Sequence, residues 1–348
     1  MPRGDTTRDA GRRFDYAVVA GVLTGTTGLV LDVRSHIEGV DFADEGFLTP
    51  EHAVIYGGFL AVLGLVFAVT YRNRRAGADW LEAIPRGYRV GVVGLLVFAL
   101  AGPADAGWHT LFGAEANVEA LVSPTHLLLA SGGVLFVSSP VRAAWRRADA
   151  TGWRGLAPAV VAATLVYTVL TVFTLFAHPT FLEAGTGGVG PALGLAAVLL
   201  QSALLVGLVL TLVGRFALPP GALALLVGAN SAAMAWLGAT PRLALAAVVA
   251  GVVVDLSYHL LVPGPTRPGR YRLFAAFVPA AVHGAYFGAV ALDGALVWTI
   301  HLWTGAVALS GAVGLLLSYA VLPTARTDPR RAGPGVTAGH GAPEPGDD

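Results

Sequence analysis

Residues 191–214 read PALGLAAVLLQSALLVGLVLTLVG, with no charged side chain in 24 positions. A helix of about 20 mostly apolar residues crosses the hydrocarbon core of a bilayer, so this stretch predicts a transmembrane helix. The whole chain shares this character. Of its 348 residues, 55% are hydrophobic and 13% are charged, whereas soluble domains carry about 25% charged residues. We therefore expect an all-α fold, a polytopic helix bundle in a membrane.

Ten stretches are long and apolar enough to be spans. They lie at residues 15–33, 51–71, 89–110, 123–141, 156–177, 191–214, 219–237, 243–262, 272–292 and 296–322. The stretch at 219–237 is the shortest. These spans predict an N-terminal segment (1–14), a tandem repeat of two helical hairpins (15–141) and six further transmembrane helices (142–322). The remainder (323–348) is rich in Pro, Gly and charge, a composition typical of a disordered tail.

The arginine residues predict the orientation. They gather in the N-terminal segment and in every second loop, while the other loops are acidic or neutral apart from Arg34 and Arg242. Cytoplasmic loops carry the excess of positive charge, so we expect a multi-pass protein of the cell membrane with both termini cytoplasmic. A net charge of zero gives no support for a nucleic-acid partner. The absence of cysteine excludes disulfides, thiol catalysis and iron–sulfur clusters.

One polar pattern occurs twice in this apolar chain. Residues 32–52 read DVRSHIEGVDFADEGFLTPEH and residues 105–126 read DAGWHTLFGAEANVEALVSPTH. Each begins with Asp-x-x-x-His and ends with Ser/Thr-Pro-x-His. The period is 73 residues for the Asp and the first His, and 74 for the second His. The candidate site residues are therefore Asp32, His36 and His52 in the first copy and Asp105, His109 and His126 in the second.

The spacing predicts where these side chains lie. An Asp and a His four residues apart share one helix face. Ser or Thr followed by Pro is a helix start with the hydroxyl residue at the N-cap, so the last His is the third residue of the next helix. A hairpin brings the end of one helix beside the start of the next. Each copy thus gathers two imidazoles and one carboxylate at the external face, a donor set for a divalent transition metal.

Each half of the pattern has a simpler interpretation. Ser/Thr-Pro is common at helix starts without any metal, and an Asp–His pair at i,i+4 can be a local ion pair. The recurrence of all three residues in register favours a metal site. Ionisable residues at membrane depth are functional candidates by default.

A further set of polar residues falls within the later spans. Asp255 and His259 lie in the eighth span and His283 in the ninth. They are candidates for an intramembrane polar cluster that conducts protons or ions, for a third site, or for hydrogen bonds between helices. The alternatives to a metal-binding protein are therefore a proton- or ion-coupled transporter and a non-catalytic scaffold.

The pattern DAGWH…SPTH resembles the Asp-x-x-x-His…Thr-Pro-Ser-His signature of the third subunit of the copper membrane monooxygenases, the methane and ammonia monooxygenase family. In that family the Asp and both His bind copper within the bilayer, and a neighbouring site follows an Asn-x-x-x-His…His pattern. The resemblance implies copper at Asp105, His109 and His126, and a second copper at the matching positions Asp32, His36 and His52. The donor set also accepts iron or zinc.

The resemblance covers about the first 140 residues. It implies partner proteins in the membrane and, for an enzyme, an oxidation that uses the bound copper. The chain departs from the family in two respects. The two His are separated by 15 and 16 residues, more than in the family, and ten spans exceed the number usual for the family member it resembles.

Overall fold

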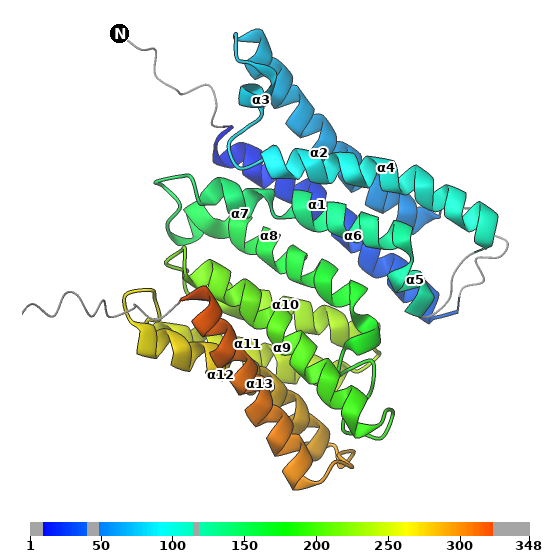
Figure 1. Ribbon diagram of the computed structural model, residues 1–348, viewed down its shortest axis with the longest axis vertical. Coiled ribbons are helices and arrows are strands. Elements are labelled where there is room, and N and C mark those ends of the chain that lie inside the picture. The colour runs from blue at the N-terminus through cyan, green and yellow to red at the C-terminus, as the bar shows by residue number, and fades with distance from the viewer. Residues whose placement is uncertain (1–9, 40–48, 114–117, 323–348) are drawn as a thin grey trace, which may run out of the picture.

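The computed structural model describes residues 10–39, 49–113 and 118–322, in which all regular secondary structure is helical (Figure 1). Within these ranges, nine helical stretches are long and apolar enough to cross a membrane, which confirms the all-α polytopic bundle. They are α1 (Gly11–Ile37), α2 (Pro50–Arg75), α4 (Arg89–Phe112), α6 (Pro124–Val137) with its continuation α7 (Ser139–Ala144), α8 (Gly152–Phe173), α9 (Pro191–Val213), α11 (Pro241–Leu261), α12 (Pro268–Leu292) and α13 (Ile300–Val321). The predicted disordered tail lies outside the described residues.

The remaining helices are short. They are α3 (Trp80–Ala83), α5 (Val118–Val122), the 3-10 helix η1 (Leu175–Ala177) and α10 (Ala222–Leu237). The seventh predicted span corresponds to α10, whose 16 residues extend over about 24 Å, less than the roughly 30 Å of a hydrocarbon core. Pro219 and Pro220 precede this helix, and a proline has no N–H for a helical hydrogen bond. The expected ten spans are therefore nine spans and one shorter apolar helix.

The two N-terminal hairpins pack in the same way. In the hairpin of α1 and α2, a Cβ atom on Gly58 would lie 2.4 Å from Gly25 N. In the hairpin of α4 and α6, a Cβ atom on Gly132 would lie 2.9 Å from Gly94 O. Glycine is needed at both positions because the neighbouring backbone approaches so closely. Gly58 and Gly132 are 74 residues apart, the same period as His52 and His126, so the repeat in the sequence is also a repeat in packing.

Helix α8 lies at the centre of the molecule and is the most buried span. It packs against α1, α6 and α7 on one side and against α10 on the other, and Figure 1 shows it between the two hairpins and the later helices. The two hairpins contact each other directly at few points. This arrangement leaves space between them, bounded by α8.

The two ends of the bundle differ in charge. At the end where α1 begins and α6–α7 ends, Tyr88 donates a 2.7 Å hydrogen bond to the buried Asp15, which also pairs with Arg147. We call this the arginine end. The opposite end, where α1 and α4 finish and α2 and α6 begin, carries the residues of the repeated pattern, and we call it the site end.

Candidate metal centre

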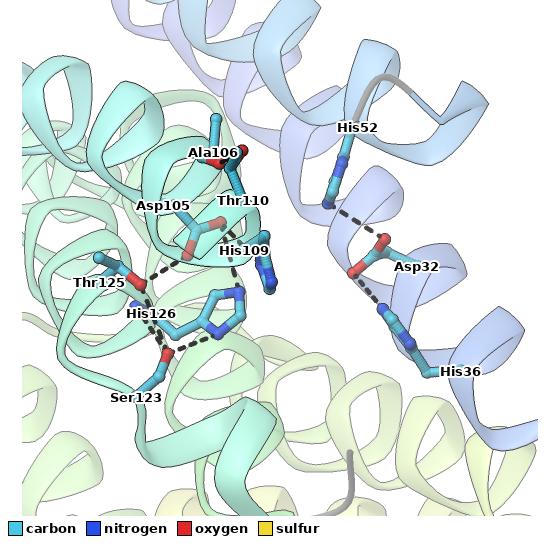
Figure 2. A network of polar contacts seen from close by, with 10 residues as sticks. All are labelled: Asp32, His36, His52, Asp105, Ala106, His109, Thr110, Ser123, Thr125 and His126. Atoms are coloured by element: carbon cyan, nitrogen blue, oxygen red, sulfur yellow. Dashed lines mark hydrogen bonds and ion pairs between the residues drawn. The ribbon is translucent and has the colours of Figure 1, made fainter. Parts of the chain in front are cut away.

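The second hairpin brings one carboxylate and two imidazoles together at the site end. Asp105 and His109 lie one turn apart on α4, and His126 lies in the first turn of α6. His109 Nε2 and His126 Nε2 each lie 3.5 Å from the same oxygen, Asp105 Oδ2 (Figure 2). Among the described residues, these three alone form a group of His, Asp or Glu side chains whose ligand atoms all lie within 4.8 Å of one another.

Two hydroxyl groups hold this triad in place. Asp105 is 1% exposed, and its second oxygen, Oδ1, accepts a 2.6 Å hydrogen bond from Thr125 Oγ1. Ser123 Oγ lies 2.9 Å from His126 Nδ1 and accepts the backbone N–H of His126, as the predicted N-cap does. In the tautomer that donates from Nδ1 to Ser123, Nε2 of His126 keeps a lone pair toward Asp105. Such outer hydrogen bonds fix the orientation of metal ligands.

The first hairpin places the matching residues less compactly. His52 Nε2 lies 3.5 Å from Asp32 Oδ1, and His36 Nε2 lies 3.8 Å from the other oxygen, Oδ2. Figure 2 shows the two imidazoles approaching Asp32 from opposite sides. The side chain of His36 is 43% exposed. The repeat predicted two equivalent triads, but the described part of the chain contains one, in the second hairpin.

One position in the repeat explains this difference. Thr125, between Pro and His in the second copy, corresponds to Glu51 in the first. The carboxylate of Glu51 accepts a 3.2 Å hydrogen bond from Ser35 Oγ. Asp32 Oδ1 consequently lacks the partner that Thr125 gives Asp105, and it accepts no hydrogen bond from the described residues. Each oxygen of Asp32 is left to face a different imidazole.

A cavity of about 90 Å³ lies between the two hairpins. Asp32 and His52 line it from one hairpin, and Asp105 and His126 line it from the other. Apart from these groups its wall is mainly aliphatic, aromatic and glycine residues of α1, α2, α4, α6 and α8. A ligand held by the triad would therefore face a space that is largely apolar.

Asp255 lies apart from this region and has a structural partner. Its two oxygens accept the backbone N–H groups of Gly221 at 2.8 Å and Leu223 at 2.9 Å. These groups belong to the start of α10, where backbone donors lack helical acceptors, and leaving them unpaired in a membrane would cost several kcal/mol. His259 Nε2 lies 3.6 Å from Asp255 Oδ2. Asp255 thus caps the short helix α10 from the neighbouring helix α11.

His283 does not join Asp255 and His259. Counted from the turn between α11 and α12, the two positions differ in depth by about 13 Å at the helical rise per residue. His283 Nδ1 lies 3.0 Å from Pro279 O and 3.3 Å from Ser202 Oγ. The predicted three-residue cluster is therefore divided in the structure between two separate places.

His283 lines a second, smaller cavity of about 60 Å³ with His178 and Tyr286. His178 lies in the loop after η1, where burial lowers its pKa to about 3, so its imidazole is neutral. His178 Nδ1 accepts the backbone N–H of Thr180 at 3.3 Å, which places the proton of the neutral ring on Nε2. This arrangement suits hydrogen bonding better than metal ligation through Nε2.

Two residues at the triad were not identified from the sequence. Thr125 occupies the variable position of Ser-Pro-x-His, and its hydroxyl, directly before the His, was the available signal. Tyr56 lies one turn after His52 on α2 and lines the cavity. Aromatic residues are frequent in membrane helices, so nothing in the sequence distinguished this one.

The chain was compared with protein-family models, with curated proteins and with solved structures, and it matches none of them. The interpretation of the site therefore depends on its geometry and chemistry.

Proposed function

We propose that Asp105, His109 and His126 bind a divalent transition metal ion within the membrane. The observation that carries this proposal is the 3.5 Å separation of both Nε2 atoms from one carboxylate oxygen. This separation is longer than a good N–H···O hydrogen bond, which is about 2.9 Å. Ligand atoms bound at about 2.05 Å in a tetrahedral site lie about 3.3 Å apart. The triad is thus spaced as the edges of a coordination polyhedron are.

The donor set narrows the choice of metal. Two imidazoles and one carboxylate suit iron(II), copper and zinc and are a poor match for calcium or magnesium. Copper is preferred because of the resemblance of the second pattern to the copper membrane monooxygenases. A bound ion would supply open coordination positions toward the cavity. The chain's own part is to orient the ligands through Thr125 and Ser123 and to exclude water with the apolar wall.

The arginine pattern supports a placement of this site near the external face. Both termini lie at the arginine end in the arrangement that the basic loops favour. The two exceptions have local partners: Arg34 donates to Trp236 O and Leu237 O at the end of α10, and Arg242 pairs with Asp293 at 3.0 Å. These arginines satisfy local groups and do not contradict the orientation. Further membrane subunits, as in the family resembled, belong to this proposal.

The transport alternative receives no comparable support. A carboxylate that carries protons or ions must exchange its partners, whereas Asp255 caps α10 with both oxygens. We therefore assign it a structural role, with the triad as the functional centre.

The proposal is tested by metal analysis of the detergent-purified protein. After loading with Cu(II) and removal of loosely bound ions by a chelator, we expect about one ion per chain on the triad's three ligands. His109→Ala should lose this ion. His301→Ala, at the exposed start of α13, is the matched control and should keep it. An unaltered protein without metal, or a His109→Ala variant that retains it, would contradict the proposal.

A further inference from the structure

Tyr56 belongs to the first hairpin, but its hydroxyl lies against the helix that carries the triad of the second. A Cβ atom on Gly102 of α4 would lie 3.1 Å from Tyr56 Oη and 3.1 Å from Tyr56 Cε1. Gly102 and Asp105 are three residues apart and share one face of α4. The absence of a side chain at Gly102 therefore lets the phenol reach the helix face that bears the carboxylate of the triad.

The ring of Tyr56 is held between two other rings. Its centroid lies 6.1 Å from that of His52 and 6.1 Å from that of Phe98, each in an edge-to-face arrangement. The side chain lines the same cavity as Asp105 and His126. The hydroxyl is close enough to Asp105 and Asp32 for both carboxylates to act on it electrostatically. Tyr56 is thus a fixed polar group in a largely apolar wall, beside the triad.

The repeat shows that this arrangement belongs to one site only. At the period of 74 residues, Tyr56 corresponds to Ala130, and at the period of 73, Gly102 corresponds to Leu29. Both Leu29 and Ala130 also line the cavity. The large and small residues are exchanged between the two halves. The exchange fills similar space in each half but places a hydroxyl only beside the second triad.

The other hydroxyl among the residues that line the cavity belongs to Thr26. Thr26 lies six residues before Asp32 on α1, which is about 9 Å deeper along the helix. Tyr56 is therefore the hydroxyl nearer to the triad. A three-ligand metal site keeps at least one position for water or another ligand, and an uncharged phenol is a good donor to an anion bound there.

We propose that the Tyr56 hydroxyl donates a hydrogen bond to the small anion or water molecule that occupies the open coordination position of a metal ion held by Asp105, His109 and His126. This inference rests on the proposed function. It makes the two hairpins parts of one site: the second supplies the metal ligands, and the first supplies a group that holds the exogenous ligand. The ligand class is a small oxygen or nitrogen donor, such as hydroxide or azide.

Azide binding to the Cu(II)-loaded protein tests the inference, because azide bound to Cu(II) gives a charge-transfer absorption band that can be titrated. Tyr56→Phe should weaken azide binding about tenfold, the loss expected for one hydrogen bond to a charged ligand. The copper content and the affinity for copper should stay within about twofold, since Phe keeps the packing of the ring. Tyr16→Phe, the same chemical change at an exposed position of α1, should leave azide binding unchanged.

A second variant separates the hydroxyl from the packing. Tyr56→Ala combined with Gly102→Leu copies the Ala130 and Leu29 pair of the other half, and it should weaken azide binding as Tyr56→Phe does. Unchanged azide affinity in both variants would overturn the role of Tyr56 while leaving the metal site intact. Parallel loss of copper and azide binding would also overturn it, because Tyr56 would then support the metal itself. Failure of the unaltered protein to take up copper would overturn the proposed function and this inference together.

Discussion

The two N-terminal hairpins carry the same pattern and the same glycine contacts, yet they arrange their polar groups differently. In the second, both imidazoles lie 3.5 Å from one oxygen of Asp105, because Thr125 occupies the other oxygen. In the first, Glu51 takes the place of Thr125, and the oxygens of Asp32 face His36 and His52 separately. The shared motif thus determines where the ligands lie, while one neighbouring residue determines whether they converge.

The largest expected effect comes from neutralising each carboxylate in turn. Asp105→Asn should weaken metal binding more than about 100-fold, since loss of a direct ligand exceeds the 10- to 100-fold cost of losing an outer partner. Asp32→Asn should weaken the tightest binding less than about tenfold. Competition with a chelator of known affinity measures both variants. Equal losses in the two variants would show that the hairpins are equivalent sites after all.

A smaller effect is expected at the position that distinguishes the hairpins. Thr125→Val keeps the shape of the side chain but removes the hydrogen bond to Asp105, and it should weaken metal binding about tenfold. Glu51→Thr introduces the hydroxyl in the first hairpin and should increase the affinity of a second, weaker ion. The same competition titration, extended to a second equivalent of metal, checks both. The comparison fails if Thr125→Val binds metal as tightly as the unaltered protein.

The smallest effect on metal binding is expected at the third Asp-x-x-x-His, Asp255 and His259. Asp255→Asn should reduce the stability to unfolding by about 1 kcal/mol, because the amide retains only one oxygen to accept the N–H groups of Gly221 and Leu223. Its metal affinity should equal that of the unaltered protein. Thermal unfolding in detergent and a parallel metal titration measure the two quantities. Loss of metal without loss of stability would instead make Asp255 a ligand.

Much of the fold could be predicted from the sequence because the bilayer imposes strong constraints. Long apolar stretches became helices, and Thr49 and Ser123 act as N-caps that position His52 and His126. The exception, α10, is short because prolines precede it and Asp255, distant in sequence, caps it. Hydropathy could not show this, since the length of an apolar stretch does not reveal which side chain satisfies its backbone.

The site could be predicted in composition but not in detail. The spacing of Asp105, His109 and His126 correctly brought them together, because helix periodicity and hairpin geometry are local rules. The difference between the hairpins depends on Thr125 reaching a carboxylate on another helix. The approach of Tyr56 to Gly102 joins two hairpins. Contacts of this kind depend on tertiary packing, and a single sequence contains no direct signal for them.

The central claim is that the second hairpin alone forms the tight metal site. Pulsed electron paramagnetic resonance of the protein loaded with one equivalent of Cu(II) tests it most directly, because the remote nitrogen of each bound imidazole modulates the signal and the imidazoles can be counted. We expect two imidazoles in the unaltered protein and in His36→Ala, and one in His109→Ala. A spectrum that loses an imidazole in His36→Ala, or stays unchanged in His109→Ala, would contradict the claim.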